Sequence, residues 1–592
     1  MARDITLDQY APLSHKAGLG AAVAGLQLAP TWVTEPHRRR LAAYRILHGY
    51  LHNVARCFFE ADTTRNAEAR VRAVMAGHDR DERGDLLEYG DAALLVARIV
   101  GAILGDTLTL SVAGADVDTL PDIGDPPPDP GTDATDIERR IYASALARWE
   151  RDAAAAVDAW EAAIASQPEA QARQAWLRQW AETDAAAVTL RLATSDAVGL
   201  GDGVIAIGWD AEKQRPTWTR YDPGFYFPAL SDEASSGFPD TVHVAWEEVH
   251  REPAGERTYV RRQTWTLVPL EAPVTYPYAE TPSSTVCVFS DGLWPTETLE
   301  GRKVDAFDAP ARWITEPVSL GIDFIPVVHI PGIDVGDDFG QSFLARVAQL
   351  LDEIIATDTD ISKAAALAAG PAIALSGASA LGDVEVEPGA VYNLGDGGRM
   401  DVLEMSKGLA ELCAVGDIHL DRLSVVSQVA GEVLGRVVDS SPISGVAIAL
   451  RFGPFRQLID ATRLVHRRKW DLAVKMTQRI AAANGDPDVT GPALPAHVVP
   501  GAFLPADLAG VVEVVSKARA AGAMSQETAV SLVAESGVAV DDVRREVALI
   551  READTKGAVE VFTAVGEEAA AARLGVEPPP AAPAADLGVG GV

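Results

Sequence analysis

The sequence predicts an α+β protein of several domains, in which mostly helical segments flank one β-rich stretch. Apolar residues recur at helical spacing before residue 188 and again after residue 342. Between them, 188–330 holds short β-branched runs bounded by turn residues, which are typical of strands. A length of 592 residues exceeds what one hydrophobic core supports, and a hydrophobic fraction of 48% is enough for most of the chain to fold.

Charge and cysteine content exclude several classes of protein. The chain has 51 basic and 85 acidic residues, a net charge of −34, so ordinary tight binding to duplex DNA is not expected. The acidity fits either plain solubility or a surface that lets nucleic acid pass without sticking. Three scattered cysteines (Cys57, Cys287 and Cys413) predict neither a disulfide framework nor a metal site and fit a reducing compartment. The acidic start is unlike a signal peptide, and no apolar run reaches membrane-spanning length.

The first part of the chain is predicted to be helical. A helix begins near Pro36 with Thr34 as its cap, and a second spans 91–104. The basic run 37–40 is interpreted as the solvated face of the first helix, with nucleic-acid contact as the alternative. After a Pro-rich loop at 121–136, a helical block follows whose tryptophans are expected to anchor packing: Trp149, Trp160, Trp176 and Trp180.

Strands are predicted in the β-rich stretch, at 204–210, 218–223, 241–249, 258–268 and 324–331. A glycine-rich segment at 199–203 precedes the first of them. It lacks the Lys-Ser/Thr of a phosphate loop and leads into a strand, so we do not expect phosphate binding there. His329 in the last strand is interpreted as a packed or capped histidine, because no partner lies at metal-ligand spacing.

A helical hairpin is predicted at 342–436. Apolar residues mark one helix at 342–369, which Pro371 ends, and another at 409–434. The intervening 371–406 holds short β-prone runs and forms a small β unit at the tip. The glycines Gly416, Gly431 and Gly435 permit bending or close approach of the two helices. The residues expected to pack the helices together are Phe343, Val347, Leu350, Ile354, Leu420, Leu423 and Val426.

A long helix at 446–483 follows a break at 437–445 and is locally basic. Its cations are expected either to pair with acids of a neighbouring segment or subunit or to contact a polyanion. They include Arg451, Arg456, Arg463, Arg467, Arg468 and Lys469. The C-terminal part predicts helices capped by Asp507, Ser525 and Asp541, and then a disordered tail after residue 573.

No motif in the sequence predicts catalysis. His419 and Asp421 are neighbours within one helix but lack a nucleophile elbow, a metal triad or a nucleotide loop around them. We therefore expect no enzyme, no catalytic residue, no metal and no cofactor. Function has to be inferred from architecture.

Four segments together resemble the portal proteins of tailed double-stranded DNA bacteriophages with long non-contractile tails. The sharpest is Ile-Ser-Gly-Val-Ala-Ile-Ala-Leu at 443–450, followed by Phe455 and Leu458. The second is 521–528 with 541–546. The others are the strand 324–330 leading into 342–351, and the helix exit 371–377.

The resemblance implies a phage-portal-like architecture for the whole chain. It implies a mixed wing at 1–341, stem helices at 342–370 and 407–436 with a clip at 371–406 between them, and a tunnel loop at 437–445. A long wing helix with its connection would occupy 446–500, a helical crown 501–572, and a disordered tail 573–592. The tunnel-loop residues that would face DNA are Val437, Val438, Asp439, Ser440, Ser441, Pro442, Ile443 and Ser444.

The resemblance also implies partners and location. Portal subunits form a homo-oligomeric ring, typically a dodecamer, at one capsid vertex of the virion after assembly in the host cytoplasm. Double-stranded DNA passes through it during packaging and ejection. Terminase and head–tail connector (adaptor) proteins would bind the clip, and scaffold or major capsid protein would surround the ring, with no membrane involved. The alternative is another non-enzymatic virion head or head–tail connector protein.

Overall fold

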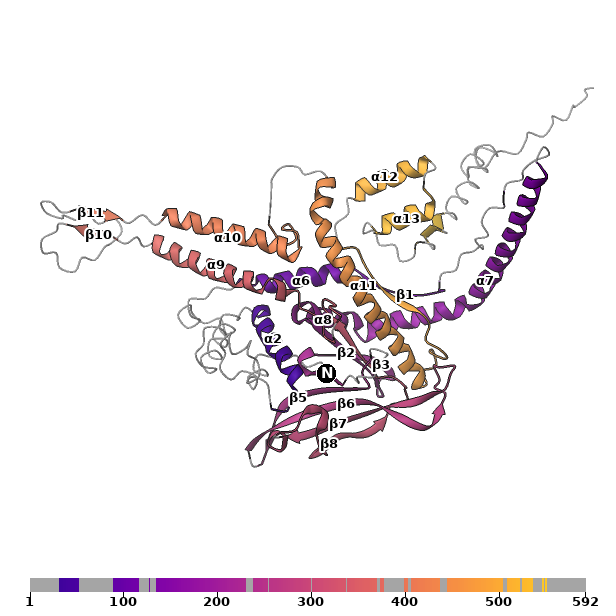
Figure 1. Cartoon of the computed structure of the whole chain (residues 1–592), viewed down its shortest axis with the longest axis horizontal. Coiled ribbons are helices and arrows are strands. Elements are labelled where there is room, and N and C mark those ends of the chain that lie inside the picture. The colour runs from indigo at the N-terminus through magenta and orange to yellow at the C-terminus, as the bar shows by residue number, and fades with distance from the viewer. Residues whose placement is uncertain are drawn as a thin grey trace, which may run out of the picture. The chain divides into compact units, whose positions relative to one another are not determined.

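A computed structural model gives the fold of the chain (Figure 1). It describes residues 31–52, 89–115, 127, 135–229, 238–299 without 254, 301–369 without 337, 373–376, 399–402, 406–436, 445–503, 508–535 without 522–523, and scattered positions between 543 and 550. The chain divides into two compact units, which are described separately: 1–110 with 175–499, and 111–174 with 500–592. Helices and antiparallel sheets both contribute, which confirms the α+β class.

The core of the first unit is a three-stranded sheet in the order β3-β2-β9. Its strands are β2 (Asp202–Asp210), β3 (Arg215–Tyr221) and β9 (Val327–Pro331), all antiparallel. Successive residues of β2 are buried, so both faces of this strand are covered. The helices α8 (Ala186–Leu200) and α11 (Gly445–Ala483) pack against the sheet.

Two shorter helices complete this core. They are α2 (Glu35–Leu51) and α6 (Asp91–Leu104), and both pack on α8. Leu95, Ile99 and Ile103 of α6 are almost fully buried at helical spacing, as their sequence period predicts. Among the described helices, none has both the length and the apolar character needed to cross a bilayer.

A five-stranded antiparallel meander forms the second sheet of this unit, in the order β4-β5-β6-β7-β8. Its strands are β4 (Tyr226–Ala229), β5 (Thr241–Glu252), β6 (Gly255–Val274), β7 (Ser283–Pro295) and β8 (Arg312–Ser319). A further two-stranded sheet joins β1 (Leu108–Val112) to β12 (Ala496–Pro500). The strands predicted at 204–210, 241–249, 258–268 and 324–331 all coincide with strands of these sheets.

The predicted helical hairpin consists of α9 (Ala348–Ala369) and α10 (Ser406–Ser427), which lie side by side (Figure 1). The short strands β10 (Ile373–Ser376) and β11 (Arg399–Val402) pair antiparallel at its tip. A single turn of 3-10 helix, Leu344–Arg346, precedes α9. The chain therefore leaves α9 through β10, returns through β11, and runs back along α9 as α10.

Three predicted boundaries are wrong. Residues 188–200, expected to begin the strand-rich stretch, belong to α8, because Leu190, Ala193 and Ala197 recur at helical spacing and are buried. The first hairpin helix begins at residue 348 and not at 342. The second ends at Ser427 and not at 436, because Gln428 adopts a left-handed φ of 61° that a helix cannot continue.

In the second unit, the described elements are helical. The helix α7 (Asp136–Thr183) begins there and continues past residue 174, and α12 (Leu508–Ala520) packs with α13 (Gln526–Glu535). The predicted cap Ser525 accepts a hydrogen bond from the backbone N–H of Thr528, at 3.2 Å. The tunnel-loop segment 437–444, the clip residues 377–398, the cap residues Asp507 and Asp541, and the tail 573–592 lie outside the described residues.

Candidate functional site

The root of the hairpin is tied to the sheet by a buried carboxylate, Asp202, at the start of β2. Its Oδ1 accepts hydrogen bonds from His329 Nε2 at 2.6 Å and from the backbone N–H of Gly340 at 2.7 Å. The hydroxyl of Tyr44 donates to its Oδ2. Ser342 completes the junction by donating from Oγ to the carbonyl of Gly199 at 2.7 Å. We call Asp202, His329, Gly340 and Ser342 the α9 anchor.

Close backbone approach at the α9 anchor requires glycine. Gly201 has a φ of +110°, and a Cβ there would meet the backbone N of Ser342 at 2.9 Å. A Cβ at Gly340 would lie 2.3 Å from the carbonyl oxygen of Gly201, and one at Gly332 would lie 2.0 Å from that of Ala197. The glycine-rich segment 199–203 therefore packs the end of α8 against the hairpin root, and it leads into a strand as expected.

Helix α2 supplies side chains to this junction, which corrects the interpretation of 37–40 as a solvated face. Arg40 donates to the carbonyl oxygens of Pro223 at 2.6 Å and Tyr226 at 2.7 Å, and its guanidinium lies 4.4 Å from the ring centre of Phe339. His37 is buried, and burial lowers its pKa to about 3. Farther along α2, Tyr50 donates to Oδ1 of Asp352 on α9, at 2.9 Å.

A buried ion pair lies in the same core. Arg220 of β3 donates from Nε and Nη2 to the two carboxylate oxygens of Asp196 on α8, at 2.5 and 2.6 Å. Burial, and then the nearby charge of Asp222, raise the pKa of Asp196 well above its usual range. The two-pronged contact fixes α8 to the sheet. With the α9 anchor, it makes this region a dense polar network enclosed by apolar side chains.

Most of the predicted hairpin-packing residues are shielded from solvent, although Phe343 and Val347 lie before α9 begins. Phe343, Val347, Ile354 and Leu423 are buried, and Leu350 and Leu420 are half-buried. The prediction for Val426 is wrong, because its side chain is 49% exposed. At Gly416, an added Cβ would lie 3.4 Å from Ile361 Cδ1, an ordinary van der Waals contact, so the approach of the helices at this point does not require glycine.

Few polar contacts join the two hairpin helices. Thr357 Oγ1 of α9 lies 3.2 Å from His419 Nδ1 of α10, within hydrogen-bonding distance. The turn after α10 folds back on it, since Arg436 pairs with Asp421 at 2.7 Å and with Asp417 at 3.2 Å. The hairpin therefore depends mainly on apolar packing along one seam.

The outer face of α10 carries an exposed apolar line. Val415 and Ile418 are 40% and 50% exposed, and Val425 is 77% exposed. Their spacing places them on one side of the helix. Sequence periodicity missed this line, because it took the apolar residues of α10 as a single buried stripe.

The structure separates the predicted basic residues of α11 into two groups. Arg463 donates to the carbonyl oxygens of Ala102 and Ile103 at the end of α6, at 2.8 and 2.9 Å. Arg451 pairs with Glu432 at 3.0 Å, and Arg456 with Asp460 at 3.7 Å. Lys469 is half-buried, and burial lowers its pKa. Arg467 and Arg468 remain exposed on the helix surface.

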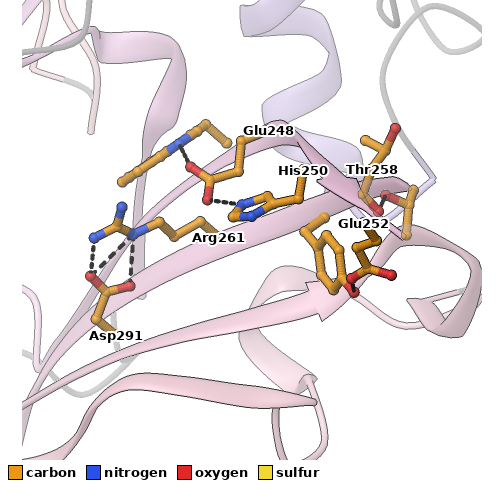
Figure 2. Close-up of polar contacts among 9 residues, drawn as sticks. Glu248, His250, Glu252, Thr258, Arg261 and Asp291 are labelled. Carbon is orange, nitrogen blue, oxygen red and sulfur yellow. Dashed lines mark hydrogen bonds and ion pairs between the residues drawn. The ribbon is translucent and has the colours of Figure 1, made fainter. Parts of the chain in front are cut away.

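A second cluster of acids, histidine and arginine lies on the five-stranded sheet (Figure 2). Arg261 of β6 donates to both oxygens of buried Asp291 on β7, at 3.0 and 2.6 Å. On β5, Glu248 accepts from Trp246 Nε1 at 3.0 Å and contacts His250 Nε2 at 2.6 Å. These contacts lie within or between neighbouring strands, so the cluster fixes their alignment.

The polar contacts of this region connect separate elements of the fold. Within the described residues, no group of three or more His, Cys, Asp or Glu side chains could hold a metal ion. His329 is held by Asp202 and stacks on Tyr226 with ring centres 5.6 Å apart, as expected of a packed histidine. Compared with known proteins, the chain matches no family model, and no curated protein is significantly similar to it.

Proposed function

We propose that the chain is a phage portal subunit, which forms a ring at one capsid vertex and serves as the conduit for DNA during packaging and ejection. One observation carries the proposal. The paired helices α9 and α10 are anchored at their root, while α10 leaves a line of apolar side chains exposed. Such a line is stable in water when a neighbouring copy covers it.

The sequence resemblance supplies the rest of the proposal. The hairpin would be the stem, the segment 371–406 the clip that binds terminase and then head–tail connector proteins, and 437–445 the tunnel loop beside DNA. The crown would be 501–572, and scaffold or major capsid protein would surround the ring. In this assignment the protein is not an enzyme and resides at the portal vertex of the virion.

A heterologous ring requires two different complementary faces on each copy. The outer face of α10 would supply one of them, through Val415, Ile418 and Val425. The dense polar network at the α9 anchor would hold the hairpin in a fixed orientation relative to the sheet, which closure of a ring needs. The alternative is a non-enzymatic head or head–tail connector subunit, which would also assemble from copies.

Imaging of the purified full chain by negative-stain electron microscopy, with native mass spectrometry, tests the proposal. Rings of about twelve subunits with an axial hole are expected for a portal. A compact monomer or an open lattice without an axial hole would refute it.

Deleting 440–444 should leave rings intact and impair DNA packaging, and normal DNA filling would contradict the assignment of the tunnel loop.

A further inference from the structure

The exposed face of α11 forms a basic stripe with one exposed apolar side chain at its N-terminal end. The opposite face of α11 packs in the core. Its side chains there are almost completely buried at helical spacing: Phe455, Ile459, His466 and Trp470. Since that face fixes the rotation of the helix, the side chains on the other side are held outward. We call Leu464, Arg467, Arg468 and Lys475 the α11 stripe.

Within the described residues, no ion pair neutralises the cations of the α11 stripe. Arg467, Arg468 and Lys475 are exposed, and in the described part of the chain no hydrogen bond or ion pair engages them. The carboxylates of the same helix interact with other groups. Asp460 pairs with Arg456 at 3.7 Å. Asp471 accepts from His497 Nδ1 at 2.8 Å and from the backbone N–H of Val498 at 3.0 Å.

Three unpaired cations together are unusual in so acidic a chain. The protein has 85 acidic and 51 basic residues, and the other α11 arginines named above are paired or donate to backbone carbonyls. Leu464 is 71% exposed, one helical turn before Arg467 and Arg468. A large exposed apolar side chain beside arginines is a combination that protein-docking surfaces use.

We infer that the α11 stripe is an electrostatic docking surface for a second copy of this chain, an inference that rests on the proposed ring. Charge complementarity favours a second copy as the occupant, because acidic residues outnumber basic ones by 85 to 51 in each copy, so carboxylates on its surface can pair locally with the three cations. Such a contact is heterologous, as ring closure requires. Nucleic acid fits less well, since an exposed leucine gains nothing from phosphates.

The stripe would act mainly on the rate and specificity of assembly. Opposite charges steer approaching copies into the correct orientation and suppress wrong pairings, and this effect weakens as salt screens it. Burying Leu464 against the neighbour would add an apolar contribution that is insensitive to salt. The two components are therefore separable by experiment.

The test compares full-length variants by sedimentation velocity and native mass spectrometry at low and high salt. The double variant Arg467→Glu/Arg468→Glu should associate at least about tenfold more weakly than wild type at low salt, with the gap narrowing at high salt. Leu464→Gln should weaken association equally at both salt concentrations. The matched control is Arg251→Glu/Arg302→Glu, which changes the same charge at exposed positions on the first unit. Circular dichroism confirms that each variant is folded.

The outcomes separate this inference from the proposed function. Rings that assemble equally well with reversed charges and in the control would overturn the docking role while leaving the portal assignment intact. Charge-sensitive association into particles without an axial hole would support the docking surface and refute the portal assignment. If the double variant instead loses salt-dependent binding to a short DNA duplex and assembles normally, the stripe serves nucleic acid and the inference is wrong. A wild-type chain that remains monomeric overturns both proposals.

Discussion

The core around the α9 anchor and the α9–α10 hairpin differ in the interactions that stabilise them. In the anchor region, buried polar groups such as Asp202, Asp196 and Arg220 are satisfied by partners from separate elements. In the hairpin, two helices share one apolar seam, and the outer face of α10 leaves Val425 exposed. The comparison shows that the core buries its polar groups with partners from the same chain, whereas the hairpin leaves apolar side chains of α10 exposed.

The largest effect is expected from Asp202→Ala. It leaves Tyr44, His329 and the N–H of Gly340 without their buried acceptor, so we expect a loss of about 3–5 kcal/mol in the free energy of unfolding, measured by urea denaturation. Asp308→Ala removes an exposed carboxylate paired with Arg302 and serves as the control. Equal losses in both variants would show that the α9 anchor is not the tie that the geometry indicates.

Acid should destabilise the core through His466. This side chain is fully buried, contacts the carbonyl of Pro331 at 2.9 Å, and its pKa is lowered by burial to about 4. Because the unfolded chain binds the proton at about pH 6.5, stability from neutral His466 is complete above that pH and is lost as pH falls towards 4.

Replacing His466 should reduce the acid sensitivity by about 3 kcal/mol between pH 7 and pH 4. The measurement compares the unfolding free energy of His466→Gln with that of wild type across this range. His37 and His243, whose pKa values are each lowered to about 3, remain in both proteins and cancel in the comparison. Parallel pH curves would contradict the prediction.

In the hairpin, Leu423→Ala should act locally. Removing this buried side chain is expected to lower the free energy of opening α10 by about 2 kcal/mol, because a cavity forms where the side chain was packed. Hydrogen exchange would show faster amides in α9 and α10, with unchanged protection in β2 and α11. Uniform acceleration throughout the first unit would mean that hairpin and core unfold together.

The smallest effect on the isolated subunit is expected from Val425→Ser. Its side chain is 77% exposed, so the unfolding free energy should change by less than about 0.5 kcal/mol. Assembly should weaken nonetheless if a neighbouring copy covers this face. The exposed Val249 on β5, changed to Ser, is the matched control, and identical assembly of the two variants would argue against α10 as an interface.

The sequence by itself determined the local elements. Periodicity located α6, α9, α10 and α11, and short β-branched runs bounded by turn residues located β2, β5, β6 and β9, because these patterns depend on neighbouring residues along the chain. It also predicted most of the hairpin seam, since Ile354 and Leu423 recur on a regular stripe. It did not predict the end of α10. That helix ends where Gln428 adopts a left-handed φ, and the pattern of apolar residues does not reveal a backbone angle.

Only the tertiary structure decided which polar residues meet. Asp202 and His329 are 127 positions apart, and Arg463 reaches Ala102 and Ile103 across more than 300, so no spacing rule could pair them. The structure also divided the basic residues of α11 into those held by the core and those left outward. Local patterns record which face of an element is apolar, but the partners of a charge depend on how distant elements come together, because electrostatic contacts form through space and not along the chain.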